Sequence, residues 1–248
     1  MESLSAVIIT LNEEKNIGRC IDSLLGLAEE ILVIDSFSSD KTIEICQAKG
    51  AKVIQNKFGG HIEQKNFALE QAKNDWVISL DADEALTKEL RQSISDVLKN
   101  PTEKGYRFNR LTNYCGKWVR FCGWYPDSKI RLVNRHFAKW GGVNPHDKLE
   151  LQNNFNEGFL KGDLLHYSYY SKEDHFKQIE YFGKIAAQEA FKKGIRVNQF
   201  TLILKVINQF IKSYFIKLGI FDGLTGLKIS YRSAYATLRK YQLLRQIK

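Results

Sequence analysis

The sequence has few cysteines and no cysteine pattern that would bind a metal. It contains no CxxC pair among its four cysteines, which are Cys20, Cys46, Cys115 and Cys122. The chain also runs from Met1 directly into the strand-like segment 4–9, without the basic and apolar regions of an export signal. A disulfide framework and a thiolate zinc site are therefore not expected, and the reducing cytoplasm is the expected location.

The sequence also lacks the glycine-rich turns of two common nucleotide-binding classes. Neither GxGxxG nor GxxxxGK[ST] occurs where a predicted strand meets a helix, which argues against a dinucleotide oxidoreductase and a P-loop NTPase. No uncharged apolar run reaches the length of about 18 residues that a spanning helix requires. The sequence has no internal repeat or low-complexity segment, and its 44% hydrophobic and 26% charged residues are typical of a folded protein.

Acidic residues are scarce in the second part of the chain. Residues 1–100 hold 11 Lys and Arg against 17 Asp and Glu, whereas residues 101–248 hold 26 against 11. The net charge of these parts is therefore −6 and +15. We expect the basic part to face an acidic partner, which would be anionic lipid, a phosphorylated glycan or nucleic acid. A solvated basic surface is the alternative.

Short apolar strands alternate with helical segments over the first hundred residues. The predicted strands are 6–11, 31–35, 52–55 and 76–80, and the predicted helices are 13–25, a segment opening at 39–41, 61–73 and 88–99. The strands are nearly all apolar and rich in Val and Ile, as buried parallel strands are. This order predicts an α/β fold with a mostly parallel, Rossmann-like sheet flanked by helices on both faces.

The pattern changes beyond Pro101. From residue 105 to 151, aromatic and arginine residues alternate with polar ones, which predicts antiparallel or mixed strands and long loops. After His166 the pattern becomes helical, with a dense apolar tract over about 200–221 that Lys205 and Lys212 interrupt. Two interpretations of this tract remain open: an amphipathic helix lying on a membrane, or a helix packed on the protein's own core.

The strongest local signal is a pair of carboxylates at the end of a buried strand. In Trp76-Val-Ile-Ser-Leu-Asp-Ala-Asp-Glu, the apolar strand is followed by Asp81 and Asp83. Ligand sites in α/β sheets lie at the carboxyl ends of strands, and an extended chain would point both carboxylates the same way. They predict a divalent metal, Mg or Mn, that bridges phosphate oxygens. The alternative is that Asp83 only caps the following helix.

Two further predicted strands end in polar turns. In Ile8-Ile-Thr-Leu-Asn-Glu-Glu, side chains and amides could contact a base or ribose, and Val33-Ile-Asp-Ser-Phe-Ser-Ser-Asp again places a carboxylate before a hydroxyl-rich turn. Thr and Asn at strand ends also form turns and cap helices, so these segments decide little by themselves.

In order and spacing, four segments together resemble glycosyltransferase family 2. They are Thr10-Leu-Asn-Glu-Glu, Asp35-Ser-Phe-Ser-Ser-Asp-Lys-Thr, Gly60-His-Ile-Glu-Gln-Lys-Asn-Phe-Ala and Leu80-Asp-Ala-Asp-Glu. The resemblance continues over nearly the whole chain, through Tyr125-Pro-Asp, Ile130-Arg-Leu, Pro145-His-Asp, Leu165-His-Tyr-Ser and Gly219-Ile-Phe-Asp-Gly. It is greatest to the bacterial branch that adds glucose to the inner core of lipopolysaccharide. It implies a GT-A fold and inverting, metal-dependent transfer from a UDP-sugar, UDP-glucose first among them, to a lipid-linked or lipopolysaccharide glycan.

The resemblance also implies roles for single residues. Those expected at the nucleotide-sugar are Thr10, Asn12, Glu14, Asp35, Lys65, Asp81 and Ala82. Those expected at the metal are Asp81, Asp83 and His166, with a purely structural histidine as the alternative for His166. Many family members carry two acidic residues where this chain has Asp35-Ser36, so only Asp35 is carried over and base selectivity is open.

An inverting transfer needs a general base that takes the proton from the acceptor hydroxyl. Asp147 is the candidate catalytic residue, although relatives often have His-Glu where this chain has His146-Asp147. Asp127 is the reserve. Four aromatic residues offer faces for sugar stacking, although each also fits a core position: Trp118, Trp124, Tyr125 and Trp140.

These expectations define three parts of the chain. Residues 1–100 are expected to bind the nucleotide-sugar, residues 101–170 to bind the acceptor in the same domain, and residues 171–248 to form a helical extension that associates with a membrane. The expected location is the inner face of the cytoplasmic membrane, with no nucleic acid as partner. The alternatives are a non-catalytic basic protein that binds acidic lipid or nucleic acid, and a sugar-phosphate nucleotidyltransferase. The first loop is acidic and without glycine, which argues against the nucleotidyltransferase.

Overall fold

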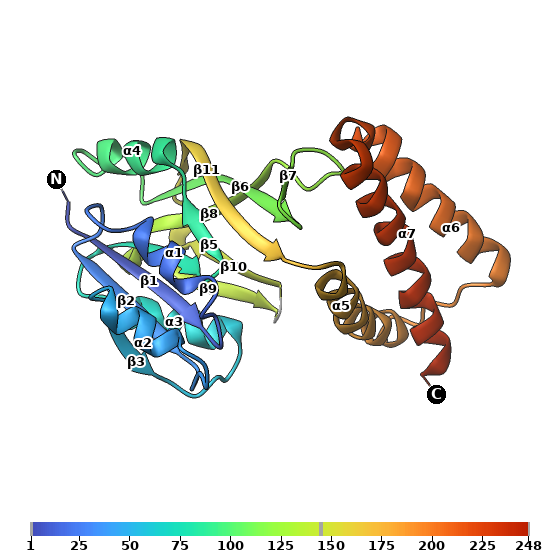
Figure 1. Cartoon of the computed structure of the whole chain (residues 1–248), viewed down its shortest axis with the longest axis horizontal. Helices are drawn as coiled ribbons and strands as arrows, with labels where there is room; N and C mark the ends of the chain where they lie inside the picture. The colour runs from blue at the N-terminus through green and yellow to red at the C-terminus, as the bar shows by residue number, and fades with distance from the viewer. Residues whose placement is uncertain (1, 144–145, 248) are drawn as a thin grey trace. The chain divides into compact units, whose positions relative to one another are not determined.

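The computed structural model describes residues 2–143 and 146–247 and divides the chain into two compact units. The first unit comprises residues 1–110 and 127–166, and the second comprises residues 111–126 and 167–248. The first unit contains the α/β sheet, and the second consists mainly of helices (Figure 1). The segment 111–126 therefore belongs with the C-terminal helices, whereas sequence analysis placed it in the acceptor half.

The predicted alternation of strand and helix is confirmed in the first unit. In chain order the elements are β1 (Leu4–Thr10), α1 (Ile17–Asp22), β2 (Glu30–Asp35), α2 (Thr42–Ala48), β3 (Lys52–Gln55), α3 (His61–Gln71) and β4 (Trp76–Asp81). These strands pair in parallel in the order β3-β2-β1-β4. Their carboxyl ends therefore lie at one edge of the sheet.

Beyond β4 the sheet becomes antiparallel. The helices and strands that follow in the chain, up to residue 169, are β5 (Glu84–Leu86), α4 (Lys88–Val97), β6 (Gly105–Tyr114), β7 (Lys117–Val119), β8 (Asp127–Asn134), β9 (Ala138–Val143), β10 (His146–Leu151) and β11 (Glu157–Tyr169). Of these, β7 lies in the second unit. The sheet continues from β4 in the order β8-β6-β11-β5, while β9 and β10 form a separate hairpin. The prediction of a mostly parallel sheet thus holds for β1–β4 alone, because the alternating segments after residue 105 add antiparallel strands.

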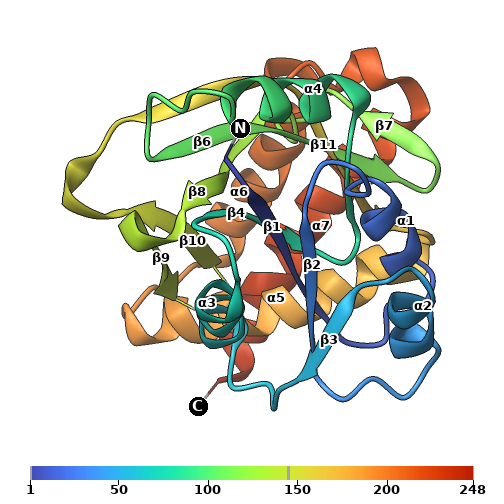
Figure 2. The same cartoon turned by 90° about the vertical axis from the view of Figure 1, so that its left-hand side faces the viewer.

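The two faces of the parallel strands bury two different sets of side chains. Alternate residues of a strand point to opposite faces, so Ile8 and Ile78 pack with α1 and α4, whereas Val7 and Val77 pack with α3 and the β9–β10 hairpin. Figure 2 shows α3 on one side of β1 and β2, with α1 and α2 on the other. The predicted covering of both faces is confirmed, although a hairpin supplies part of one cover.

Three α-helices account for most of the second unit as far as the structure describes it. They are α5 (Lys172–Lys192), α6 (Gln199–Ile211) and α7 (Gly223–Gln246). Helix α5 begins with a capping box, in which Ser171 Oγ accepts from the Asp174 N–H and the Asp174 carboxylate accepts from the Ser171 N–H. Hydrogen bonds of this kind satisfy backbone donors that a helix start leaves unpaired.

The predicted continuous tract over 200–221 is broken in the structure. After α6 come a π-helical turn (Lys212–Ile216) and a 3-10 turn (Gly219–Asp222), joined at Leu218, whose φ of 56° is left-handed. A Cβ on Gly226 would lie 1.8 Å from the carbonyl oxygen of Gly219. Glycine at position 226 therefore permits the start of α7 to pack against this turn.

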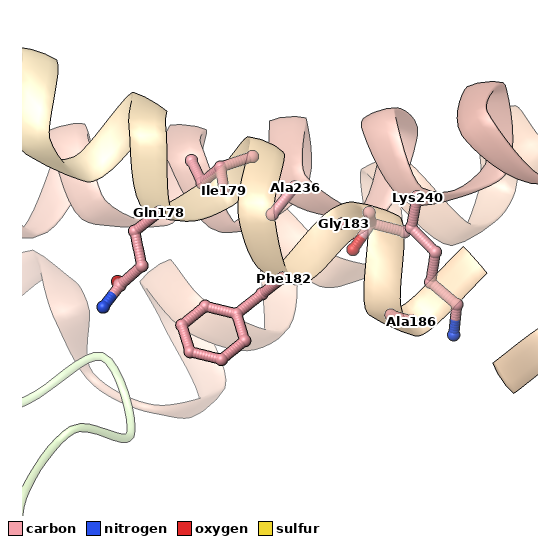
Figure 3. Close-up of a pocket in the computed structure, with 8 residues that line it drawn as sticks. Gln178, Ile179, Phe182, Gly183, Ala186, Ala236 and Lys240 are labelled. Carbon is pink, nitrogen blue, oxygen red and sulfur yellow. The ribbon is translucent and has the colours of Figure 1, made fainter. Parts of the chain in front are cut away.

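A shallow hollow of about 300 Å³ lies between α5 and α7 (Figure 3). It is lined mainly by small and apolar side chains, among them Ile179, Gly183 and Ala236, and Lys240 extends along it. None of the residues predicted to bind substrate or metal lines this hollow, so it is separate from the candidate site.

Candidate active site

The predicted site residues converge at the carboxyl edge of the parallel strands. Thr10 of β1 pairs with Asp35 of β2, and its neighbour Ile9 pairs with Asp81 of β4. Thr10 is buried, and its Oγ1 has no hydrogen-bond partner among the residues that the structure describes. A buried hydroxyl without a partner is unfavourable, so this atom marks a place where a bound molecule would supply a hydrogen bond.

The loops after β1 and β2 are joined by hydrogen bonds from the predicted nucleotide residues. Asn12, with a left-handed φ of 55°, accepts from the Ser39 N–H at 2.8 Å, and Glu14 accepts from the Lys41 N–H at 3.2 Å. Asp35 is fully buried and accepts from the Ser38 N–H at 2.9 Å. Asn12 and Glu14 thus join the two loops, whereas Asp35 bonds within its own loop. Helix α1 begins at Ile17 rather than near residue 13.

The chain turns between the two carboxylates of the Asp-Ala-Asp segment. Strand β4 ends at Asp81, residues 82 and 83 form a turn, and β5 begins at Glu84. The chain is therefore not extended through Asp83, and the strand alternation from which a shared direction of the two carboxylates was expected does not apply. The helix-cap alternative for Asp83 is also wrong, because α4 starts at Lys88 and the Oγ1 of Thr87 accepts from the Leu90 N–H at 3.2 Å.

Lys65 joins two predicted site residues from distant parts of the chain. Its buried ammonium lies 3.0 Å from Asp81 Oδ1 and 2.8 Å from Asp147 Oδ2, above the ring of Trp140. Burial alone would raise the pKa of Asp81, but Lys65 and Arg131 outweigh it and hold that pKa well below its usual range. Asp81 therefore stays ionised at neutral pH.

Asp83 and His166 form a second pair beside the first. Strand β11 pairs with β5 so that His166 lies opposite Glu84, next to the turn that carries Asp83. His166 Nε2 lies 3.2 Å from Asp83 Oδ2. Burial alone would lower the pKa of His166, but the charge of Asp83 outweighs it and raises that pKa. The antiparallel pairing thus brings together two residues that are far apart in the sequence.

The donor set of this pair fits a divalent cation that binds together with a diphosphate. A carboxylate and an imidazole in contact can share one metal, and Mg²⁺ and related ions take their other ligands from phosphate and water. Within residues 2–143 and 146–247, no three His, Cys, Asp or Glu side chains gather into a metal cage. Asp83 and His166 are the predicted ligands that fit, whereas the Asp81 carboxylate is engaged by Lys65.

A cavity of about 570 Å³ opens beside Lys65 and Asp147, and cations dominate its lining. The basic residues at its wall are Lys65, Arg107, Arg110, Lys129, Arg131 and Lys148, against the acidic Asp81, Asp147 and Glu157. An anionic or strongly polar ligand suits such a wall better than an apolar one.

Sequence reasoning missed three charged residues that organise this cavity. Buried Glu84 accepts from the Asp81 N–H at 3.0 Å, and Arg110 lies 3.4 Å from its other oxygen. Buried Arg131 lies over Trp140, 3.5 Å from Asp81, and its Nε has no hydrogen-bond partner in the described part of the chain. Arg131 belongs to the segment Ile130-Arg-Leu, which is part of the family resemblance in the sequence. Only the pairing of β8 with β4 shows which side chains Arg131 faces.

The structure separates the remaining candidates. Asp127 is held by Arg110 at 2.7 Å and by Lys129 at 2.9 Å; burial raises its pKa, but these two cations lower it further than burial raises it. Trp140 is 1% exposed beneath Lys65 and Arg131, so it has no free face for a sugar.

Two of the other aromatic candidates contact rings of the second unit, and Trp118 remains 36% exposed. Trp124 packs with Tyr169 and His175, and Trp118 packs edge-on with Tyr167. In the segment Pro145-His-Asp, which contains the candidate base Asp147, Pro145 lies outside the residues that the structure describes.

Several known proteins are similar to this chain in sequence. The model of glycosyl transferase family 2 matches residues 5–120. An uncharacterized glycosyltransferase of Rickettsia typhi is 30% identical over 261 residues, covering 100% of this chain and 88% of the relative. The lipopolysaccharide core biosynthesis glycosyltransferase LpsC of Rhizobium meliloti is 27% identical over 259 residues, covering 97% of this chain and 93% of LpsC.

A solved structure matches the fold over the same extent. Residues 1–349 of TarS from Staphylococcus aureus superpose with a TM-score of 0.51 at 15% identity, covering 99% of this chain and 92% of that one. The fold and site together define a glycosyltransferase with a GT-A fold. The chain belongs to glycosyl transferase family 2. This membership sets aside the nucleotidyltransferase and the non-catalytic binding protein.

Proposed function

We propose that this glycosyltransferase moves glucose from UDP-glucose to a glycan acceptor of the lipopolysaccharide inner-core type, with inversion at the anomeric carbon. The observation that carries the proposal is the arrangement around Lys65. Lys65 joins Asp81, at the edge of the parallel strands that holds the predicted nucleotide residues, to the candidate base Asp147, and all three line one cation-rich cavity. The Asp83–His166 pair lies in the turn that follows Asp81 and on the strand beside it. Donor, leaving group and acceptor would each have a place there.

The proposed reaction uses Asp147 as general base. Its Oδ2 is held by Lys65, while its Oδ1 accepts no hydrogen bond from the described residues and can take the proton of an acceptor hydroxyl. The acceptor oxygen then bonds to the anomeric carbon, the bond from that carbon to the diphosphate oxygen breaks, and UDP leaves. A divalent cation held by Asp83 and His166 would neutralise charge on the diphosphate.

Asp127 is the weaker candidate for the base. Its Oδ2 accepts two hydrogen bonds from Arg110, at 3.0 and 2.7 Å, and Lys129 pairs with Oδ1. Because both oxygens are occupied by cations, taking up a proton would break these contacts. We therefore assign Asp127 to positioning Arg110 and keep Asp147 as the base.

The cation-lined cavity supports an acceptor that carries anionic groups. The basic side chains at the wall outnumber the acidic ones, and the Nε of the buried Arg131 has no hydrogen-bond partner among residues 2–143 and 146–247. A phosphorylated or carboxylated glycan would satisfy these cations better than a neutral one. LpsC, whose name places it in lipopolysaccharide core biosynthesis, supports the same acceptor class. We further propose that the enzyme meets this acceptor at the inner face of the cytoplasmic membrane.

A donor screen tests the proposal directly. Hydrolysis of UDP-glucose, UDP-galactose, UDP-N-acetylglucosamine and GDP-mannose would be measured with Mg²⁺, with Mn²⁺ and with EDTA. We expect UDP-glucose to be preferred and EDTA to abolish turnover. Preference for a GDP-sugar, or full activity in EDTA, would contradict the donor or the metal assignment. With an acceptor in hand, NMR of the product would show whether the configuration is inverted.

A further inference from the structure

Helix α6 carries apolar side chains on two opposite sides. Leu202 and Val206 face α7, where they pack with Tyr241 and Leu244. Phe200, Ile203, Leu204, Ile207 and Ile211 follow one another at three- and four-residue spacings on the outside, where each is 40% exposed or more. Packing on the protein's own core thus accounts for one side of the helix and leaves the other in contact with solvent.

Apolar exposure continues along the chain beyond α6. Ile216 of the π-helical turn is 66% exposed, Phe221 is 69% exposed, and Leu224 in the first turn of α7 is 74% exposed. The outer side of α6 and these three residues are called the apolar face below. An apolar groove of about 290 Å³ borders it between α6 and α7, where Ile207 and Tyr231 are part of the wall. Exposed apolar side chains that follow one another along the chain in this way point to an interaction surface.

The charges around the apolar face are almost all positive. Residues 191–248 contain 12 Lys and Arg and one acidic residue, Asp222. The carboxylate of Asp222 is turned inward, since it accepts from the backbone N–H groups of Arg120 and Phe121. Lys205, Lys212 and Lys217 are exposed along the same stretch. A second copy of this chain would bring the same positive charge against this surface, which argues against a homodimer there.

We propose that the apolar face inserts shallowly into the anionic leaflet of a lipid bilayer, while the flanking lysines contact lipid phosphates. An apolar stripe with lysines beside it is the pattern of helices that lie in a membrane interface. Lysine stems can cover apolar surface while their ammonium groups reach the head groups. Within residues 2–143 and 146–247 there is no helix of the length and apolarity that crossing a bilayer requires. The proposal extends the proposed function, because it gives the enzyme a surface for a membrane-borne acceptor.

Sedimentation of the full chain with vesicles tests this proposal. The protein would be mixed with vesicles of phosphatidylcholine and phosphatidylglycerol, and with vesicles of phosphatidylcholine alone, at low and high salt. We expect binding to the anionic vesicles that high salt weakens but does not abolish, because screening affects the lysines and not the inserted apolar residues. In the double variant Phe200→Gln/Leu224→Gln, each substitution should weaken vesicle binding at least about tenfold, because each removes one inserted apolar side chain.

Two further variants separate the contributions. The double variant Lys212→Gln/Lys217→Gln should bind anionic vesicles about fivefold more weakly for each lysine replaced. Its binding to neutral vesicles should change little. Leu25→Gln, which alters a side chain of the first unit that is 46% exposed, is the matched control and should bind as the wild type does. UDP-glucose hydrolysis without vesicles should be the same in all variants, so failure of the proposed donor reaction and failure of membrane docking are distinguished.

Three results would overturn the proposal. One is recovery of the wild-type protein in the supernatant with every vesicle. The second is equal vesicle binding by the wild type and the Phe200→Gln/Leu224→Gln variant, which would place the contact elsewhere. The third is a dimer in analytical ultracentrifugation that this variant dissociates, which would make the apolar face an interface between copies of the chain.

Discussion

Lys65 shows how single residues couple the parts of the site. The Lys65 side chain is 4% exposed, and its charge is compensated by Asp81 from β4 and Asp147 from β10. A buried charge that loses its partner is costly, often by about 3–5 kcal/mol. Changes at these carboxylates therefore alter stability as well as chemistry, whereas Asp83 lies outside this network and can be changed more cleanly.

Replacing Asp83 with Asn should abolish metal-dependent binding of UDP and leave the fold intact. The carboxylate lies in a turn, is partly exposed, and pairs with His166 rather than with a core cation. Calorimetric titration of UDP with and without Mn²⁺ measures the effect, and thermal unfolding checks the fold. Asp75→Asn, at an exposed residue that pairs with His136, is the matched control. Unchanged UDP affinity and metal dependence in the Asp83 variant would refute the metal assignment.

Replacing Asp147 with Asn should slow sugar transfer by about 10²- to 10⁴-fold, the usual effect of losing a general base. UDP-glucose binding should change little, because Asn can still accept the hydrogen bond from Lys65, whereas the lost ion pair should appear as lower thermal stability. Single-turnover kinetics at saturating donor, together with calorimetry, separate the two effects. Asp127→Asn is the comparison: it should lower stability through the loss of the Arg110 contact, and slow transfer less. The reverse order of transfer rates would move the base to Asp127.

At the scale of elements, helix α5 buries a histidine among aromatic rings. His175 lies 5.4 Å from Tyr114 and 4.8 Å from Tyr169 between ring centroids, and its Nδ1 is 3.2 Å from the hydroxyl of Tyr114. Burial lowers the pKa of His175 from 6.5 to about 4. The imidazole consequently stays neutral in the folded protein under conditions in which the unfolded chain is protonated.

This shift predicts acid sensitivity of the second unit. The unfolded chain binds a proton near pH 6.5 and the folded chain only near pH 4, so stability falls as pH drops through that window. Between about pH 7 and about pH 5 the loss from this residue should be about 2 kcal/mol. Urea unfolding of the full chain measures it, and His175→Gln should remove that part of the pH dependence. An identical pH slope in the variant would show that other groups cause it.

At the scale of the whole molecule, the two units are not consecutive in the chain. The segment 111–126 leaves the first unit, contributes Tyr114, Val119 and Cys122 to an apolar cluster with Ile229 of α7, and returns at Asp127. The Cys122 N–H also donates to the carbonyl of Lys217 at 2.9 Å. Removing the C-terminal helices would therefore expose apolar side chains that belong with them.

A chain ending at residue 170 should accordingly fold poorly. We expect it to bind the dye ANS and to be less soluble than the full chain, because segment 111–126 loses its partners. The matched control also replaces residues 111–126 with a short glycine-serine linker and should be more soluble and bind less dye. Equal solubility and dye binding of the two truncated proteins would show that segment 111–126 does not depend on the helices.

Local patterns in the sequence predicted much of this protein. The bounds of β3 and the start of α4 follow from nearby residues, since apolar runs and turn residues act over a few positions. The same patterns placed Thr10, Asp35 and Asp81 at strand ends, and parallel pairing then brings strand ends together. The resemblance to the family added His166 and Asp147, which no local pattern singles out.

Only the tertiary structure decided what these residues face. The pairing of β8 with β4 and of β11 with β5 brings Arg131 to Asp81 and His166 to Asp83, and residue spacing does not specify such pairings. The burial of Trp140 and the break at Leu218 likewise depend on contacts with distant segments. Local sequence therefore determined the elements and the residue types at their ends. Long-range packing determined which charges meet, because ion pairs depend on distance in space rather than along the chain.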